Sequence, residues 1–114
     1  MKKNSLILLF ICQFILINSL VASEKIPIVI EKNVPGAPQL LGIPFPKDKL
    51  QSSDQVKVLN SLGQEIPSQI TIVNTWEPVS TSVKWIWVFF FSDAQNNYSV
   101  EFGADVVRKE FTGD

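Results

Sequence analysis

The segment Val83-Lys84-Trp85-Ile86-Trp87-Val88-Phe89-Phe90-Phe91 carries the strongest structural signal in this 114-residue chain. Apart from Lys84, it consists of aromatic and β-branched residues, which favour strands. Rings and valine fill one face of such a strand, and aliphatic residues with Phe90 fill the other. A strand that is apolar on both faces is typical of the centre of a sheet covered on both sides. We therefore expect residues 83–91 to form a central strand with Trp85 and Trp87 in the core.

Shorter strand patterns flank this segment, and turn residues separate them about every ten positions. We expect extended segments at 26–30, 39–46, 55–59 and 66–76, and an outer strand at 98–103. Residues 47–50 are compatible with a single helical turn, and no long segment has a helical period. The sequence predicts an all-β domain, a small barrel or sandwich of five to six or more short strands.

The N-terminus has the layout of a secretory signal peptide. Two lysines precede an apolar run over residues 6–17, and Val21-Ala22-Ser23 supplies small residues for a cut after Ser23. The apolar run is shorter than the roughly 20 residues that span a bilayer, so an uncleaved anchor is the less favoured alternative. We expect a secreted, periplasmic or cell-envelope protein whose membrane contact is confined to residues 1–23.

This layout divides the chain into three parts. Residues 1–23 are the predicted signal peptide, and residues 24–105 are the predicted β-domain. Residues 106–114 form either a final strand or the start of a linker to a further domain.

The composition of residues 24–114 excludes several classes of chemistry. The chain has no His, and its one Cys, Cys12, lies in the predicted signal, so Ser–His or Cys–His catalysis and Cys/His zinc sites are excluded. Without Lys2 and Lys3, the 10 Lys and Arg become 8, against 11 Asp and Glu, a net charge of −3. We therefore expect no nucleic-acid partner and no cofactor.

The remaining candidates for chemistry are carboxylates, one lysine and one tryptophan. We interpret the acidic residues as surface charge rather than as the carboxylate pair of a glycosidase, because nearly all fall in turns or at strand ends. They are Asp48, Asp54, Glu65, Glu77, Asp93, Glu101 and Asp105. We expect Lys84 to have a structural role, either as a buried lysine with a charged partner or as a lysine at the edge of a sheet. A role as a base with a shifted pKa is the less favoured alternative. Trp76, beside a polar turn, is the best candidate for carbohydrate contact, although a core position stays open.

Three motifs in order resemble one family. They are Gly42-Ile43-Pro44-Phe45-Pro46, then Gly63-Gln64-Glu65-Ile66-Pro67, then Ser82-Val83-Lys84-Trp85 after Trp76. This arrangement resembles the N-terminal RIFT-related β-barrel domain of exo-rhamnogalacturonan lyase-like (YetA-like) proteins. Its structural motif residues here are Gly42, Pro44, Pro46, Gly63, Lys84 and Trp85. One departure is Ser80-Thr81, where the family carries Asp-Gly.

The resemblance implies a RIFT-like barrel with an accessory role. In the family, this barrel precedes a helical toroid that carries the lyase chemistry, so no catalytic residue transfers to this chain. The implied function is a non-catalytic accessory domain of an exported rhamnogalacturonan-degrading protein, here a truncated fragment. Its implied partners are the toroid domain and pectin-like glycan. The alternative is a stand-alone envelope protein that offers a β edge to a partner or binds carbohydrate weakly.

Overall fold

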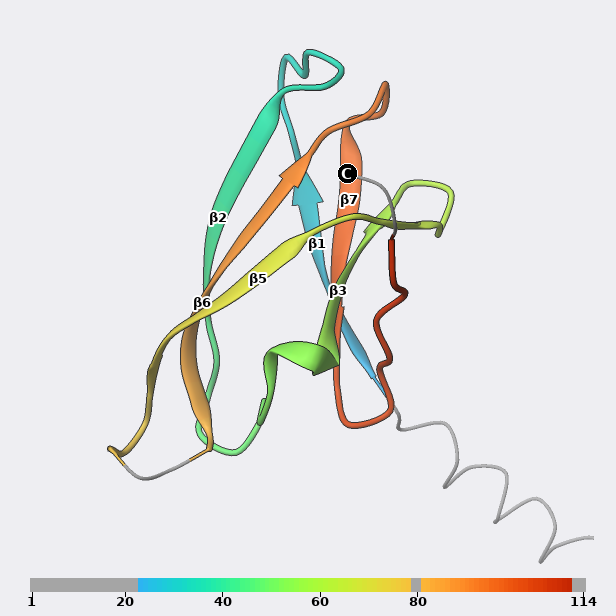
Figure 1. Ribbon diagram of the computed structural model, residues 1–114. Helices are drawn as coiled ribbons and strands as arrows, with labels where there is room; N and C mark the ends of the chain where they lie inside the picture. The colour runs from blue at the N-terminus through green and yellow to red at the C-terminus, as the bar shows by residue number, and fades with distance from the viewer. Residues whose placement is uncertain (1–22, 79–80, 112–114) are drawn as a thin grey trace, which may run out of the picture.

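The computed structural model describes residues 23–78 and 81–111, and these residues form an all-β structure (Figure 1). Its strands are β1 (Glu24–Val29), β2 (Pro38–Pro44), β3 (Val56–Asn60), β4 (Glu65–Ile66), β5 (Gln69–Thr75), β6 (Val83–Phe91) and β7 (Asn97–Phe102). A short 3₁₀ turn, η1, spans Ser53–Gln55. The predicted all-β class is confirmed.

The predicted signal peptide falls almost wholly on residues 1–22, which lie outside the described residues. Within the described part of the chain, no helix has the length and apolar character needed to cross a bilayer.

The strands form two antiparallel sheets that face each other (Figure 1). Sheet A has the order β1-β7-β3-β4, and sheet B has the order β2-β6-β5. The prediction that residues 83–91 form a central strand is confirmed, because β6 lies between β2 and β5. The prediction that residues 98–103 form an outer strand is wrong, because β7 lies between β1 and β3. The alternation of apolar and polar residues in β7 indicates only that one face of the strand is buried. A strand at any position in a sheet can have one buried face.

The core lies between the inner faces of the two sheets. Ring pairs join the layers: Phe45, just after β2, meets Phe102 of β7 at 4.9 Å between centroids, and Phe90 of β6 meets Tyr98 of β7 at 5.1 Å. The other buried members are aliphatic, namely Ile43, Leu50, Val56, Val58, Val83, Ile86, Val88 and Val100. Full burial of each such side chain stabilises the fold by about 1.5–3 kcal/mol.

The strand predicted at 66–76 is divided between the two sheets. Pro67 has no N–H to donate to a ladder, and it separates β4 from β5. As a result, β4 pairs with β3 in sheet A, whereas β5 pairs with β6 in sheet B. Register shifts interrupt the β5–β6 pairing, with Val73 as the extra residue on β5 and Lys84 as the extra residue on β6.

The turns follow local hydrogen bonding rather than helical geometry. Residues 47–50 form a turn in which the Lys49 amide donates to the Pro46 carbonyl, in place of the expected helical turn. The β6–β7 loop is held by Tyr98, whose hydroxyl donates to Asp93 Oδ1 at 2.7 Å and accepts from the Asp93 amide at 2.8 Å. This hydroxyl bond is the main reason that the pKa of the Asp93 carboxyl is lowered, while burial raises the pKa of Tyr98.

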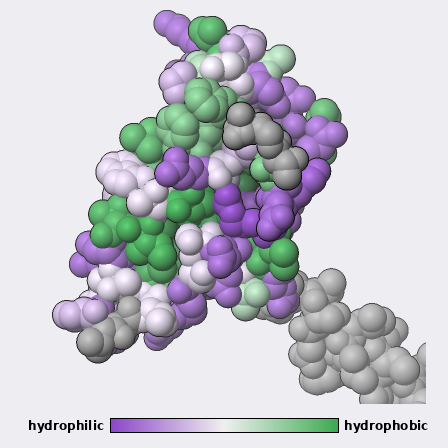
Figure 2. Space-filling view, viewed as in Figure 1, coloured by the Kyte–Doolittle hydropathy of each residue, from purple (hydrophilic) through white to green (hydrophobic). Residues whose placement is uncertain are grey.

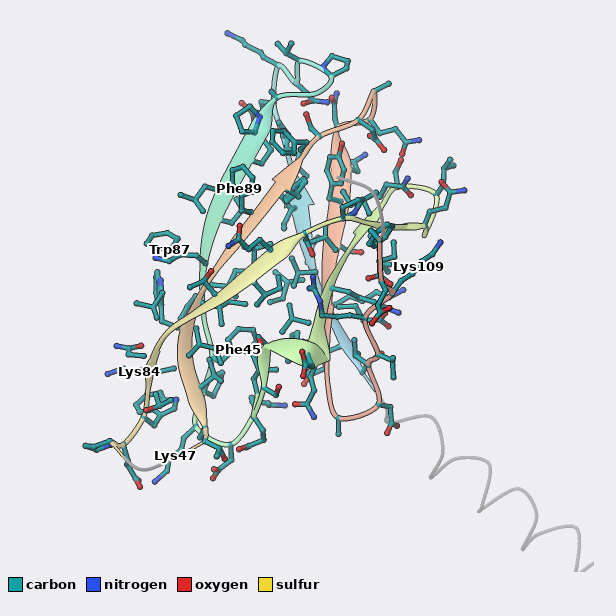
Figure 3. The ribbon with its side chains drawn as sticks, viewed as in Figure 1. Phe45, Lys47, Lys84, Trp87, Phe89 and Lys109 are labelled. Carbon is teal, nitrogen blue, oxygen red and sulfur yellow. The ribbon has the colours of Figure 1, made fainter. Side chains whose placement is uncertain are left out.

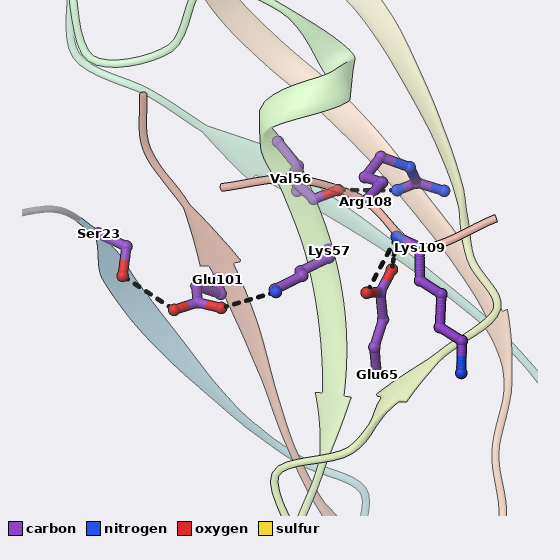
Figure 4. Close-up of polar contacts among 7 residues, drawn as sticks. All are labelled: Ser23, Val56, Lys57, Glu65, Glu101, Arg108 and Lys109. Carbon is purple, nitrogen blue, oxygen red and sulfur yellow. Dashed lines mark hydrogen bonds and ion pairs between the residues drawn. The ribbon is translucent and has the colours of Figure 1, made fainter. Parts of the chain in front are cut away.

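Residues 106–111 form a strap that crosses from sheet A towards sheet B without becoming a strand. The Arg108 guanidinium donates to the Val56 carbonyl at 2.8 Å (Figure 4). It also donates to the Ser68 carbonyl at 2.5 Å. The Lys109 amide donates to the Glu65 carboxylate at 3.0 Å. The predicted final strand is therefore not formed over 106–111, and the linker alternative stays a prediction.

The outer face of sheet A carries paired charges. Glu101 of β7 lies 3.5 Å from the Lys57 ammonium of β3, and both side chains are largely covered. Glu101 also accepts a hydrogen bond from Ser23 at 2.8 Å, just before β1 (Figure 4). The charges of Lys57 and Glu101 on this face are therefore paired.

Candidate functional site: an exposed aromatic face

The outer face of β6 is an exposed row of rings. Its inner side chains Ile86, Val88 and Phe90 are buried in the core. The outer ones are Trp85, Trp87, Phe89 and Phe91; Trp87 is 42% exposed and Phe91 is 60% exposed. The prediction that both faces of this strand are covered, with Trp85 and Trp87 in the core, is therefore wrong. The apolar run correctly marks an apolar face, but in the described structure no second layer lies over it.

The neighbouring strand β2 seats these rings. Leu40 lies opposite Phe89, Gly42 opposite Trp87, and Pro44 opposite Trp85. A Cβ atom on Gly42 would lie 2.7 Å from the Trp85 ring and 3.0 Å from the Trp87 ring. The two indoles can therefore lie close to the backbone of β2 only because residue 42 is glycine.

The rings meet edge to face. Trp85 and Trp87 have centroids 6.3 Å apart at an interplanar angle of 84°, and Phe89 and Phe91 have centroids 5.2 Å apart at 82°. Such pairs are stable arrangements of aromatic quadrupoles. They make a ridged apolar surface rather than one flat platform.

Strand β5 borders the rings with neutral polar side chains. Gln69 lies opposite Phe89, Thr71 opposite Trp87, and Asn74 opposite Trp85. Strands β2, β5 and β6 contain no Asp or Glu, and Lys84 is their only charged residue. Figure 2 shows hydrophobic side chains gathered over sheet B, while hydrophilic ones dominate the opposite side of the view. We call the outer side chains of β2 and β6, with Trp76 and Lys84, the aromatic face.

Lys84 and Trp76 form the charged end of this face. The Lys84 ammonium lies 4.9 Å from the centroid of the Trp76 ring, a cation–π distance. Figure 3 shows Lys84, Trp87 and Phe89 along the same outer side of sheet B. Lys84 is exposed and sits on the central strand, so it is neither the buried nor the edge lysine that we expected. Its structural role is instead to cover the Trp76 ring.

Trp76 is 40% exposed, as the carbohydrate prediction requires, but its indole N–H already has a hydrogen-bond acceptor within the protein. The indole Nε1 donates to the Phe45 carbonyl at 3.0 Å. The Lys84 ammonium covers one ring face, so a sugar would have to use the other or displace it.

The motif residues from the sequence lie in three places. Gly42, Pro44, Lys84 and Trp85 come together on or beside the aromatic face. Pro46 lies in the turn after β2, and Gly63 lies apart in the β3–β4 turn with φ of 79°, a value that glycine adopts without steric cost. What sequence reasoning missed is the exposure of Trp87 and Phe91, and no signal within the strand itself distinguishes an open apolar face from a covered one.

The acidic candidates do not converge. Asp48, Asp54 and Asp105 are exposed on the surface. Glu77 pairs with Lys47, and Glu101 pairs with Lys57. Among the residues that the structure describes, no three acidic, His or Cys side chains gather as a metal site would require.

Two hollows in the surface are relevant to ligand binding, one beside the aromatic face and one beside the strap. One of about 250 Å³ at the Phe91 end of the aromatic face is lined by Pro67, Ser68, Gln69, Phe89, Phe90 and Phe91. A larger one of about 500 Å³ lies between η1 and the strap. Its Arg108 is already bonded to two backbone carbonyls, so the hollow lacks a free guanidinium for a ligand. The apolar hollow extends the aromatic face.

Comparison with known proteins identifies no relative of this chain. No protein-family model, no curated protein and no solved structure matches the chain. The likeness to the lyase-associated barrel thus stays a prediction made from motifs.

Proposed function

We propose that this chain is a non-catalytic accessory domain that packs through its aromatic face against a neighbouring domain of an exported, polysaccharide lyase-like protein. The observation that carries the proposal is the exposure of Trp87 and Phe91 on a sheet face without any carboxylate. Contiguous apolar rings exposed on a small domain support this reading, since large exposed apolar patches mark interaction sites.

The geometry of the rings favours a protein surface as the occupant. Edge-to-face pairs leave ridges and grooves into which the side chains of another domain can interdigitate. The apolar hollow beside Phe89 and Phe91 offers a place for one apolar side chain. At the other end, the Lys84 ammonium would complement a carboxylate of the partner.

The size of the face favours a partner in the same polypeptide. With the bordering strand β5 included, the outer side of sheet B has three strands about 4.8 Å apart, each about seven residues long at about 3.3 Å per residue, or about 330 Å² on each side of an interface. The resulting total of about 650 Å² lies at the low end for contacts between domains of one chain. Free complexes need about 1,200–2,000 Å². A covalent link would supply the missing affinity as effective concentration.

The finer parts of the proposal rest on the sequence. The motif order supports a RIFT-like barrel, for which two facing antiparallel sheets are the coarser framework. The N-terminal layout supports export, and the motifs support a helical toroid as the neighbour, with rhamnogalacturonan as the substrate of the complete protein.

Docking is tested by titrating the chain with the separate toroid domain of a rhamnogalacturonan lyase-like protein in a calorimeter. The expected result is weak binding that Trp87→Ser weakens at least tenfold. Leu62→Ser is the matched control, because Leu62 is 70% exposed in the β3–β4 turn, outside the aromatic face. Absence of binding, or equal binding by all three proteins, rejects the proposal.

The non-catalytic part has a separate test. Mixed with rhamnogalacturonan, the chain should release no unsaturated product, measured as ultraviolet absorbance. Clear turnover would assign it an activity of its own and end the accessory interpretation.

Weak carbohydrate binding is the second candidate, because Trp76 and Lys84 together offer a ring and a cation to an acidic sugar. Pectin-derived oligosaccharides should then change the tryptophan fluorescence of the protein, and Trp76→Ala should abolish the change. A fluorescence change that persists in Trp76→Ala would show that the sugar binds at another site.

A further inference from the structure

The four edge strands of the two sheets differ in how they resist pairing with another chain. Free edges are usually blunted by proline, charge or shortness. Sheet A ends in β1, which contains Lys25 and Pro27, and in β4, which has two residues. In sheet B, β2 begins and ends with proline. Strand β5 has seven residues, Gln69-Ile70-Thr71-Ile72-Val73-Asn74-Thr75, with neither proline nor charge.

The core is also incompletely covered along β5. Ile70 and Ile72 lie opposite the buried residues Val88 and Ile86, so they point to the inner face of sheet B. Even so, Ile72 is 39% exposed. In the described structure, β5 is the last strand of sheet B; η1 packs against this strand but leaves Ile72 partly exposed. A strand added at this edge would cover it.

We infer that the free edge of β5 pairs antiparallel with β5 of a second copy of this chain. The segment is self-complementary when the two-fold axis passes through Thr71. In that register, Ile70 of each copy lies opposite Ile72 of the other on the inner face. Thr71 meets Thr71 on the outer face, and Gln69 meets Val73.

This register suits the chemistry of the strand. Opposed isoleucines extend the core across the junction, and cross-strand Thr–Thr pairs are favourable. Because β5 carries no charge, two copies meet without repulsion. The register shift at Val73 limits regular pairing to about five residues, so the dimer is weak and dependent on concentration.

The dimer leaves the aromatic face free. Pairing occurs in the plane of sheet B, so the two aromatic faces lie on the same side of one six-stranded sheet. The inference therefore stands apart from domain docking, and each can fail without the other.

Charge substitution at the two-fold axis tests the register. The protein should show a mass that rises with concentration from that of one chain towards twice that value in sedimentation equilibrium. Thr71→Lys and Thr71→Glu should each raise the dimer dissociation constant at least tenfold, because like charges meet at the axis. An equimolar mixture of the two variants should restore the dimer.

Two controls separate this result from other causes. Leu62→Lys adds the same charge in the β3–β4 turn and should leave the dimer unchanged, while Trp87→Ser should impair docking alone. Near-ultraviolet circular dichroism checks that each variant is folded. A monomer at all concentrations overturns the inference, and so does association that the Lys and Glu variants neither weaken alone nor restore together.

Discussion

The outer faces of the two sheets have opposite characters. On sheet A, the Lys57–Glu101 pair is completed by Ser23, so the charges satisfy one another. On sheet B, Trp87 and Phe91 stand exposed beside a single cation, Lys84. Both sheets bury their inner faces in the same core. The difference teaches that one layer of this fold presents paired charges to water, whereas the other presents exposed aromatic rings.

The largest expected effect tests the difference between the buried and exposed faces of sheet B, with substitutions at two adjacent phenylalanines of β6. Phe90 is 1% exposed and Phe91 is 60% exposed. Phe90→Ala should lower the free energy of unfolding by about 3–5 kcal/mol because it opens a cavity in the core. Phe91→Ala should lower it by less than about 1 kcal/mol. Urea denaturation measures both, and equal losses would mean that the outer face of sheet B is covered after all.

The next largest effect concerns the strap that ties the sheets together. Arg108→Met removes charged hydrogen bonds to Val56 in sheet A and to Ser68 before β5. The free energy of unfolding should fall by about 1.5–3 kcal/mol in urea denaturation, since both carbonyls lose a donor. Val107→Thr, at a neighbouring position that is 76% exposed, should be neutral. An unchanged Arg108→Met protein would show that the strap does not hold the sheets.

A third substitution sharpens the account of sheet B itself. Gly42→Ala places a Cβ within 2.7 Å of the Trp85 ring, so the indole must move. We expect a loss of about 1 kcal/mol in unfolding free energy and an altered near-ultraviolet spectrum of the Trp85–Trp87 pair. In a Trp85→Leu background the cost should largely disappear. A cost that persists there would place the strain in the backbone of β2 instead.

The smallest effect tests the loop that leads from sheet B to sheet A. Tyr98→Phe removes the hydroxyl that binds Asp93 and should cost about 0.5–1.5 kcal/mol. Because the pKa of Asp93 is lowered in the folded state, its stabilisation is complete above the ordinary value near 3.9 and is lost as pH falls through the folded pKa. Denaturation between about pH 5 and pH 2 should therefore show a shallower acid loss in Tyr98→Phe. An identical pH profile would mean that Asp93 is held by its other partners.

The sequence predicts the all-β class and the central place of β6 because aromatic and β-branched residues leave a local signal. It does not predict which sheet each half of residues 66–76 joins, since that depends on distant strands once Pro67 ends the first pairing. The reversal of Trp85 and Trp87 from core to surface has a similar cause. An apolar strand face indicates that contact with water is unfavourable there, but the strand itself does not show whether another layer covers that face.

For the candidate site, the sequence identifies Gly42, Lys84 and Trp85 as a motif without showing that they are neighbours. Their meeting follows from the antiparallel register of β2 and β6, which places Gly42 opposite Trp87. The bulge that turns Lys84 towards Trp76 depends on an unequal residue count between β5 and β6. Such irregularities have no pattern that periodicity can detect.

The position of β7 has a consequence for how the chain assembles. β1 and β3 pair with opposite edges of β7, which is the last strand along the described residues. A polypeptide that emerges from the ribosome, or from a narrow pore, with its N-terminus first cannot close sheet A until Asn97–Phe102 has followed. Until then β1 has no strand partner among the described residues, so closure of sheet A depends on contacts between residues far apart in the sequence, which slow folding.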